Sequence, residues 1–596
     1  MDAIRISVPQ QIPNPRVAPL FNPAKLKTWL ESLPLGSPTK TGQELLAALQ
    51  QANRAEAPVN ERYYFLDQCR PLIDGLSESL HKQYATAAVP LTDKHREAAE
   101  LAHSLLSEIA IGYKTVLLTA AASTPAAETD RNTAAAAALY AIHHLARLLV
   151  DTYGLYAPEP KNLWLEIHQI YRFAERQGIL AATLQHDAGD NSVRSIDHTY
   201  RRIIMLALAN PYHLMQGEAL QVFHELDKWT IHCHIRPLAA GISPNGNLYV
   251  DLDQDTPPQY APIHKKMQPP ADGRTMDISG ILAALEHRMK ELLISGKGES
   301  GHLTLTGRKL RNMYKRLSDA WGLRIERLSE RKQASIPVEL VVGISAAHHF
   351  AGNGADFTPE LSEIEVRKGK SGAKGQGLHL AAENDAPWLH EDQAQRLATG
   401  IFQPRTSQFA ADPAKPQDIW TKVYASQSHA KHQKGGSDPA FESIVCQLMD
   451  QSRGGMAISC KKGHGVRLIT GEVIAFKSEH APGANDWSVG VVRWLRTSAK
   501  EKLQLGIRLL ADDTAPVATR GVKGVGKDSE YFRSLLIPKL DPMQYPTTLI
   551  TPAAVYDVDS VILVNTGTQT FYARLTKLVD ASNAFSLFQF QIVDAP

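Results

Sequence analysis

Cysteine is scarce in this chain, and charge of neither sign is in excess. Four of the 596 residues are cysteines, scattered along the sequence as Cys69, Cys233, Cys446 and Cys460. This spacing excludes a small domain held by a disulfide framework and favours free thiols in a reducing cytoplasm. Lys and Arg number 64 against 62 Asp and Glu, a net charge of +2. Such a balance gives no bulk electrostatic attraction to nucleic acid, so we expect no nucleic-acid partner.

Long hydrophobic runs are also missing. Hydrophobic residues make up 43% of the chain, yet no stretch approaches the roughly 20 apolar residues that span a bilayer. The first residues, Met1 to Phe21, contain prolines and no apolar core, which is not the pattern of a signal peptide. The sequence therefore predicts a cytoplasmic protein with no membrane span.

The motifs of common catalytic and metal sites do not occur. We find no Gly-x-Ser-x-Gly elbow, no His-Glu-x-x-His pair and no dinucleotide fingerprint. The glycine-rich stretch 521–528 departs from a phosphate-binding loop, because it ends in Asp528 where Ser or Thr holds Mg²⁺. Four residues of metal-ligating types lie close together in sequence, but without the spacing of a zinc site: His224, His232, Cys233 and His234. We therefore predict that the protein is not an enzyme and holds no metal and no cofactor.

The chain is too long for one hydrophobic core, so it divides into several domains. Residues 1–231 predict an all-helical region. Asn22-Pro23 has the form of a helix cap with proline at the first helical position. One face repeats at helical spacing, through Leu163, Ile167, Ile170, Tyr171 and Ala174. A mixed α/β region follows at 232–350. Residues 351–415 have few apolar runs and predict a flexible linker or insertion.

Strand patterns dominate the last part of the chain. Residues 416–520 predict an antiparallel β-barrel, and residues 521–596 predict a further β-rich domain whose strands are split by Asn-Thr-Gly and Ser-Asn turns. Pro337–Ile344 also reads as a strand. It is a second candidate for the start of the barrel, with the later polar stretch as an insertion.

The most informative segment, Ile444–Ile458, reads as a strand, a tight turn and a second strand. Asp450, Ser452 and Gly455 form an Asp-x-Ser-x-x-Gly pattern. In such a turn the Asp and Ser side chains cap backbone N–H groups, and the glycine permits a close approach. Short polar groups and bare amides at a barrel rim suit an anionic ligand.

The order of this turn, a strand, the run Gly490–Trp494 and a strand with a central glycine resembles PilZ domains across residues 444–509. These domains are bacterial β-barrels that typically bind the second messenger cyclic di-GMP. Together with the patterns above, this resemblance predicts a multidomain α + β chain: an N-terminal all-α region, a mixed middle region, a PilZ-like antiparallel β-barrel and a second small β domain. An ordinary small barrel with an Asx turn is the alternative.

PilZ domains that bind cyclic di-GMP usually carry Arg-x-x-x-Arg a short distance before the Asp. The window 422–434 is basic, but it contains lysine and no arginine. Lysine lacks the planar fork that pairs with phosphate and stacks on guanine. We therefore predict that this second signature is absent.

The resemblance implies a ligand site around the turn. Asp450 accepts from a guanine edge or orients the turn, Ser452 donates, and Gly455 leaves room for the base. A cation has to replace the arginine pair, and the candidates are Arg453, Arg493 and Lys434. Loss of Asp450 or of Arg453 is expected to weaken binding about tenfold or more.

Two hypotheses remain open. In the first, the protein is a cytoplasmic cyclic di-GMP receptor that passes its signal to a protein partner through the helical region. The resemblance implies outputs such as type IV pilus, flagellar or surface-attachment control. In the second, a degenerate PilZ-like scaffold binds protein partners without nucleotide. The turn favours the first hypothesis, and the missing arginine pair favours the second.

Overall fold

The computed structural model forms two compact units, Met1–Arg288 with Lys315–Glu326, and Met289–Tyr314 with Arg327–Pro596. It describes residues 4–87, 89–122, 128–182, 195–264, 267–296, 303–322, 331–352, 441–452, 454–461, 468–478, 487–498, 502–511, 514–527, 529–537, 547–566 and 570–595. The predicted linker at 351–415 lies almost wholly outside the described residues. Each unit is considered by itself below.

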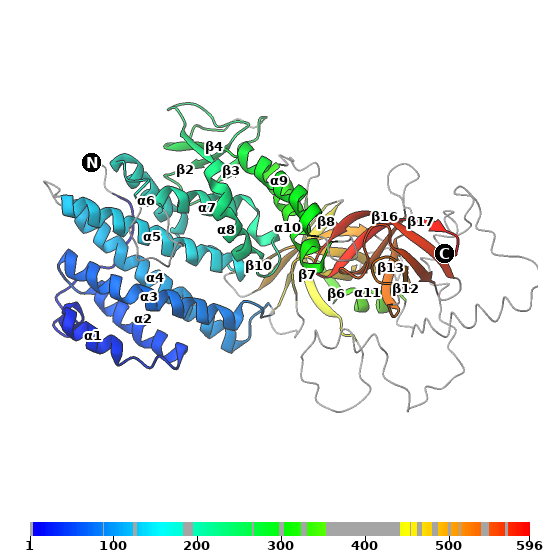
Figure 1. The fold of residues 1–596 in the computed structure, drawn as a ribbon, viewed down its shortest axis with the longest axis horizontal. Coiled ribbons are helices and arrows are strands. Elements are labelled where there is room, and N and C mark those ends of the chain that lie inside the picture. The colour runs from blue at the N-terminus through cyan, green and yellow to red at the C-terminus, as the bar shows by residue number, and fades with distance from the viewer. Residues whose placement is uncertain are drawn as a thin grey trace, which may run out of the picture. The chain divides into compact units, whose positions relative to one another are not determined.

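Helices build most of the first unit, as the sequence predicted for residues up to 231 (Figure 1). Asn22 caps the first long helix by accepting a hydrogen bond from the Lys25 N–H, with Pro23 at the first helical position. The α-helices are α1 (Pro23–Glu31), α2 (Pro38–Arg54), α3 (Val59–Tyr84), α4 (Asp93–Ala122), α5 (Glu128–Gly154), α6 (Leu163–Gln177), α7 (Ile196–Leu208) and α8 (Glu218–Trp229). Short 3₁₀ turns are η1 (Ala18–Phe21), η2 (Pro211–His213) and η3 (Thr230–His232).

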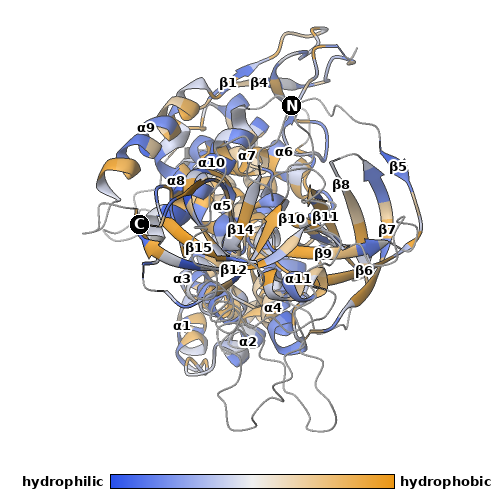
Figure 2. Ribbon diagram, turned by 90° about the vertical axis from the view of Figure 1, so that its right-hand side faces the viewer, coloured by the Kyte–Doolittle hydropathy of each residue, from blue (hydrophilic) through white to orange (hydrophobic). Residues whose placement is uncertain are grey.

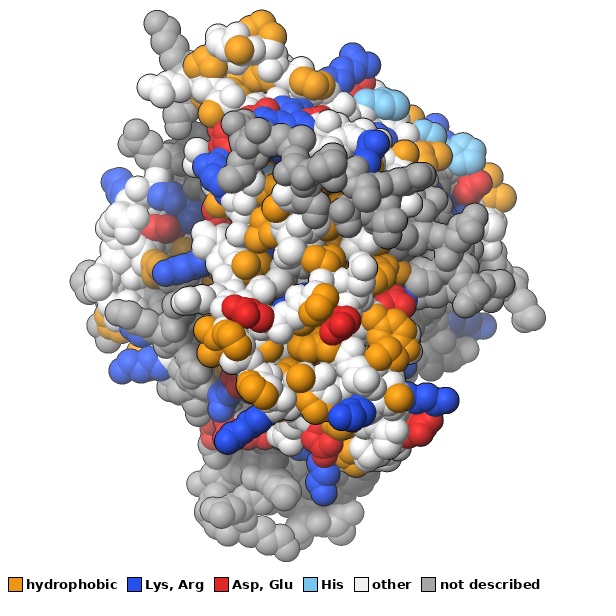
Figure 3. Space-filling view, turned by 90° about the vertical axis from the view of Figure 1, so that its left-hand side faces the viewer, with side chains coloured by type: hydrophobic (Ala, Val, Ile, Leu, Met, Phe, Trp, Pro, Cys, Tyr) orange, Lys and Arg blue, Asp and Glu red, His pale blue; other side chains and the backbone are white. Residues whose placement is uncertain are grey.

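Two of these helices are long and apolar enough to cross a membrane, which the sequence reading did not expect. They are α4 and the Arg131–Gly154 part of α5, but 67% and 83% of their most apolar windows are buried inside the protein. That burial is typical of core helices in a bundle. On the molecular face drawn in Figure 3, charged side chains lie among the hydrophobic ones.

A small sheet and two helices follow the bundle. The antiparallel strands β1 (His234–Pro237), β4 (Gly273–Asp277), β2 (Leu248–Asp251) and β3 (Gln259–Tyr260) lie in this order. Helices α9 (Ser279–Ser295) and α10 (Leu305–Gly322) come next and confirm the mixed character predicted for this region. The residues of α10 before Lys315 belong to the second unit.

The second unit contains two β-barrels (Figure 1). In the first, β7, β6, β9, β10, β11 and β8 pair antiparallel in this order, and β8 closes the ring onto β7. The strands are β5 (Lys332–Gln333), β6 (Pro337–Val342), β7 (Ile444–Ser452), β8 (Gly455–Cys460), β9 (Val473–Ser478), β10 (Ser488–Thr497) and β11 (Leu503–Ala511). Strand β6 is therefore part of the barrel, although it precedes β7 by about a hundred residues of chain. The barrel boundaries predicted from the sequence, 416–520, therefore leave out β5 and β6.

The second barrel is closed, in the order β12, β13, β14, β17, β16 and β15. Its strands are β12 (Ala515–Lys523), β13 (Phe532–Ile537), β14 (Thr548–Pro552), β15 (Val561–Asn565), β16 (Thr570–Ala581) and β17 (Phe585–Val593). Strand β15 is hydrophobic along most of its length (Figure 2) and wholly buried. The prediction of a second β domain is confirmed, and β12 places its first strand before residue 521.

One hydrophobic cluster joins the two barrels. Helix α11 (Ile344–Ala351) contributes Ile344 and Ala347, the first barrel contributes Val473 and Val491, and the second contributes Leu535 among others. A hydrogen bond of 2.6 Å from the Ser582 hydroxyl to the Gly471 carbonyl also connects them. The barrels therefore share buried surface within one unit.

The cysteine expectation is wrong for one pair. Cys446 on β7 and Cys460 on β8 face each other across the hairpin and form a disulfide, with their Cα atoms 4.5 Å apart. The spacing in sequence gave no sign of this, because strand register rather than sequence distance brings the two Cβ atoms together. Cys69 and Cys233 are free and buried, as expected.

Candidate functional site at the β7–β8 turn

The Asp-x-Ser-x-x-Gly segment forms the tight connection between β7 and β8, as the sequence predicted. Ser452 and Gly455 are the last paired residues of the hairpin, and the Ser452 hydroxyl donates to the Gly455 carbonyl at 3.2 Å. A β-bulge lies between Leu448 and Asp450. Because a bulge re-aims the side chain that follows it, Asp450 is positioned by the irregularity of its own strand.

Residue 455 has to be glycine because strand β11 packs directly against it. A Cβ atom built on Gly455 would lie 2.0 Å from the carbonyl oxygen of Ile507 on β11. That distance is far inside van der Waals contact, so β8 approaches β11 only because residue 455 has no side chain. The structure thus gives Gly455 a role in barrel closure, and the predicted role of leaving room for a base remains a prediction.

Asp450 makes an ion pair that the sequence reading missed. Arg331 Nη1 lies 2.8 Å from one carboxylate oxygen of Asp450 and 3.0 Å from the other. Arg331 immediately precedes β5, whose Gln333 pairs with Asp450 in the strand register. The side chains are 35% and 17% exposed, respectively. The pair therefore lies at the surface of the barrel beside the turn, where a ligand has access.

A row of two small, buried residues leads from Asp450 to an aromatic ring. In register across four strands, Asp450 faces Ala457, Ala457 faces Gly506, and Gly506 faces Trp494. A Cβ on Gly506 would lie 1.8 Å from Trp494 Nε1, so the indole lies across this glycine. The row is on the outer face, because the alternate residues fill the barrel interior: Met456, Ile458, Leu495, Leu505 and Ile507.

Arg493 pairs with a residue of the second barrel. Its Nη1 lies 3.7 Å from an Asp580 carboxylate oxygen, and Arg508 makes a closer ion pair with the same oxygen. Arg508 is opposite Gly455 in the strand register, so this ion cluster lies next to the turn. The structure thus assigns Arg493 a partner on β16. Its contact with a ligand stays a prediction.

Comparison with known proteins gives three matches that follow one another along the chain. Residues 24–240 match the N-terminal domain of the cyclic-di-GMP receptor FimW, residues 248–516 its middle PilZ domain, and residues 517–593 its C-terminal β-barrel domain. The chain belongs to the PilZ-domain family. It is 24% identical over 588 residues to the protein "Cyclic-di-GMP receptor FimW" of Pseudomonas aeruginosa. The aligned region covers 96% of this chain and 90% of the relative. No solved structure matches the chain.

The arginine signature of PilZ domains does occur in this chain, outside the window in which we expected it. Residues 327–331 read Arg-Leu-Ser-Glu-Arg, and the second arginine is the partner of Asp450. Arg331 is 119 residues from Asp450 in sequence. The motif lies just ahead of the Pro337 strand, which the sequence had already offered as a candidate first strand of the barrel. Arg327 itself is outside the described residues.

The other predicted cations are also outside the described part. Arg453 and Lys434 belong to segments that the structure does not describe, so both stay predictions. Within the described residues of this PilZ protein, no group of three or more His, Cys, Asp or Glu side chains is arranged to hold a metal ion.

Proposed function

We propose that this protein is a non-enzymatic cytoplasmic receptor for cyclic di-GMP, and that the ligand binds on the outer face of the first barrel beside the β7–β8 turn. The name of the P. aeruginosa relative, a cyclic-di-GMP receptor, and the match to a PilZ domain support the ligand. The observation that carries the location is the ion pair of Arg331 with Asp450, which joins the two PilZ signatures at one place.

Arg331 is the principal phosphate contact in this proposal. Both of its hydrogen bonds to Asp450 use Nη1, and among the described residues its Nε and Nη2 have no partner. A guanidinium fixed through one nitrogen presents its remaining donors in a set direction, which suits a phosphate oxygen or the edge of a guanine. Asp450 orients Arg331, and Arg327 supplies the second positive charge of the signature.

The row from Asp450 to Trp494 is the base-binding surface in this proposal. Ala457 and Gly506 are small and buried, and Trp494, which lies across Gly506, offers a half-buried aromatic surface at the far end of the row. Bases stack on aromatic rings with a gain of about 1–3 kcal/mol each. The Ser452 hydroxyl supports the turn through its bond to Gly455, and the turn's backbone N–H groups face the ligand's phosphates.

Receptor output passes to a protein partner in this proposal, through the helical unit. The pathways that PilZ proteins serve make type IV pilus function, motility or surface attachment the candidate outputs. The alternative is a scaffold that binds partners without nucleotide. The Arg331–Asp450 pair favours the receptor, because it supplies the bidentate-capable cation that the scaffold hypothesis assumed to be lost.

Calorimetric titration of the full-length protein with cyclic di-GMP tests this function, with cyclic GMP and GTP as matched guanine nucleotides. Saturable binding of cyclic di-GMP, with at least tenfold preference over both controls, is the expected result. If circular dichroism shows the protein to be folded and high micromolar ligand gives no heat of binding, the receptor proposal is wrong and the protein belongs to the scaffold class.

A further inference from the structure

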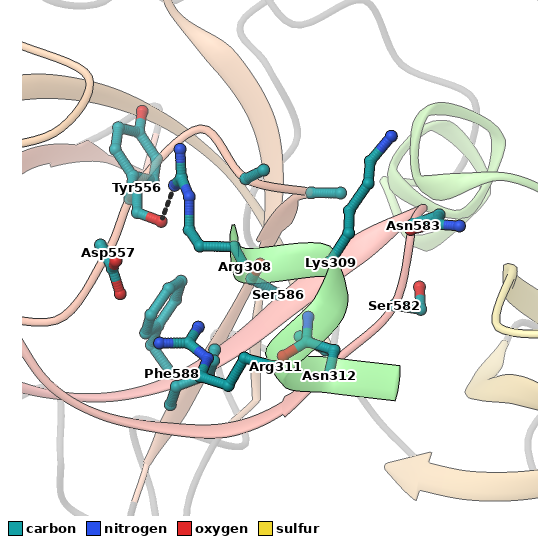
Figure 4. A pocket seen from close by; sticks show the side chains of 14 residues that line it. Arg308, Lys309, Arg311, Asn312, Tyr556, Asp557, Ser582, Asn583, Ser586 and Phe588 are labelled. Carbon is teal, nitrogen blue, oxygen red and sulfur yellow. Dashed lines mark hydrogen bonds between the residues drawn. The ribbon is translucent and has the colours of Figure 1, made fainter. Parts of the chain in front are cut away.

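A cavity of about 200 Å³ lies in the second unit (Figure 4). The first turns of α10 form one wall, the 553–557 segment after β14 forms another, and the ends of β16 and β17 form the rest. No residue of the Asp450–Gly455 turn lines it. The ligand site proposed above therefore does not account for this cavity.

Positive charge is concentrated on the helical wall. Arg308, Lys309 and Arg311 line the cavity within a single turn of α10, and Asp557 is the one carboxylate among the described lining residues. In Figure 4 Arg308 extends toward Tyr556 and Arg311 toward Phe588, with Lys309 at the opposite rim. The lining contains three cations, of which Lys309 is exposed, and one carboxylate, so it carries a formal excess of two positive charges.

The hydrogen-bonding capacity of Arg308 is not filled. Its Nη1 donates to the Tyr556 carbonyl at 3.2 Å, while its Nε is buried without a partner among the described residues. Burial lowers the pKa of Arg308, Asp557 raises it, and repulsion from Arg311 lowers it again. A buried donor left unpaired beside a like charge is costly. An anion in the cavity removes both costs.

Asp557 does not fill this role. Its side chain is buried, and one carboxylate oxygen accepts the Val558 N–H at 2.8 Å. It makes no ion pair within 4 Å with Arg308 or Arg311 in the described structure. The acid is thus bound to its own loop, which also holds Ala554 in the left-handed region at φ 60°. Strain of this kind in the wall of a cavity is typical of binding loops.

The rest of the lining is apolar or carries hydroxyl and amide groups. Phe588 and Leu578 form the apolar side, and the Asn312 amide and the Ser586 hydroxyl lie near them. The cavity therefore combines a cationic wall with an apolar side, where half-buried Leu578 packs against Phe588 of the barrel core, within a volume that admits a small molecule but no folded segment of a partner.

We propose that this cavity is a second ligand site, which binds a small phosphomonoester that carries an aromatic or apolar group. A phosphomonoester is close to a dianion at neutral pH, which matches the formal excess of two positive charges. Its phosphate bonds to Arg308 Nε and to Arg311, and its organic group packs on Leu578 beside the edge of Phe588. The two proposed sites share no lining residue.

Phenyl phosphate is the simplest probe with both features, and inorganic phosphate and phenol each carry one of them. Calorimetric titration of the full-length protein is expected to give saturable binding of phenyl phosphate about tenfold or more tighter than inorganic phosphate, and no binding of phenol. Arg311→Gln leaves the Arg308–Tyr556 bond intact and is expected to weaken phenyl phosphate binding about tenfold. Arg308→Gln is expected to do the same.

Two further variants make the result specific. Arg574→Gln removes an exposed charge on β16 that does not line the cavity, and it should leave binding unchanged. Asp450→Ala should also leave phenyl phosphate binding unchanged, so the two proposed sites can fail separately. Equal weakening by Arg311→Gln and Arg574→Gln would reduce the effect to general surface charge and overturn the site. Absence of phenyl phosphate binding, or binding only of an acidic peptide, would overturn it as well.

Discussion

Arg331 and Asp450 are 119 residues apart in sequence, yet Arg331 Nη1 lies 2.8 and 3.0 Å from the two carboxylate oxygens of Asp450. Strand β5 makes this contact possible, because it pairs with the same part of β7 that carries Asp450. The two PilZ signatures are therefore adjacent in space, although the long segment 353–440 separates them in sequence. The ion pair is partly exposed, so its contribution to stability is at most about 1 kcal/mol. Its value lies in the orientation of the guanidinium.

The two neighbouring glycines of the turn should respond differently to substitution. Gly455→Ala places a methyl group 2.0 Å from the Ile507 carbonyl, whereas a Cβ on Gly454 meets nothing within 4 Å. Crowding against a backbone atom typically costs about 1–3 kcal/mol. Chemical denaturation should therefore show a loss of this size for Gly455→Ala and a much smaller change for Gly454→Ala. Equal effects of the two substitutions would contradict the closure role of Gly455.

Gly506→Ala should displace the indole of Trp494. The new methyl group overlaps the indole nitrogen, and a side chain can move aside more easily than a strand. The affinity for cyclic di-GMP is expected to fall about tenfold, which corresponds to the loss of one stacking contact. Trp494→Ala should cause a similar loss of affinity. The Gly506→Ala/Trp494→Ala double variant should bind no more weakly than Trp494→Ala alone. An unchanged affinity in Gly506→Ala, together with a shifted tryptophan emission, would remove Trp494 from the site.

The Cys446–Cys460 disulfide should stabilise the first barrel. It closes a loop with a sequence separation of 14, for which the entropic gain is about 3 kcal/mol. A reducing agent is expected to lower the free energy of unfolding of the wild-type barrel by an amount of this order. The Cys446→Ala/Cys460→Ala double variant should show no such sensitivity, and Cys233→Ala should retain it. Wild-type protein that unfolds identically with and without reductant would contradict this pairing.

His168 should make the helical unit sensitive to acid. This buried ring lies between the Tyr200 hydroxyl and the Thr256 carbonyl, and burial lowers its pKa to about 4. The pKa in the unfolded chain is about 6.5. Between pH about 4 and about 6.5, the His168 ring is therefore protonated in the unfolded chain but not in the folded protein. Stability is fully present above pH about 6.5 and is lost as the pH falls toward 4, by up to about 1.4 kcal/mol per pH unit.

Denaturation followed by the helical circular dichroism signal, at several pH values, measures this slope. His168→Gln should make it shallower, with the remaining slope due in part to His143, whose pKa burial also lowers, although the variant starts from a lower stability at neutral pH. His264→Gln replaces an exposed histidine of the same unit and should keep the wild-type slope. A wild-type slope that His168→Gln leaves unchanged would assign the acid sensitivity to other groups.

Local patterns were sufficient to predict the elements of this fold. The cap at Asn22-Pro23, the α6 face and the β7–β8 turn all depend on neighbouring residues, and all three are confirmed. The pairing of β6 with β7 and β9 depends on closure of the barrel across a long segment. No periodicity reports such pairing, which is why the sequence predicted the barrel at 416–520 and left the Pro337–Ile344 strand as a second candidate for its start.

The candidate site was predictable to the same extent. Asp450, Ser452 and Gly455 were found because the turn holds all three within six residues. Arg331 was missed because an insertion separates it from Asp450 in sequence. Only the pairing of β5 with β7 brings the two residues together in space. Arg493 shows the opposite case: its strand was predicted correctly, but its partner Asp580 belongs to another barrel.

Titration of the Arg327→Ala/Arg331→Ala variant with cyclic di-GMP, beside the wild type, tests the central claim most directly. The arginine signature donates charge-assisted hydrogen bonds of about 1.5–3 kcal/mol each, so removal of both residues should weaken binding about a hundredfold or more. The variant should remain folded, because the ion pair with Asp450 contributes little to stability. Wild-type protein that binds cyclic di-GMP, and a folded double variant that binds it equally well, would contradict the account.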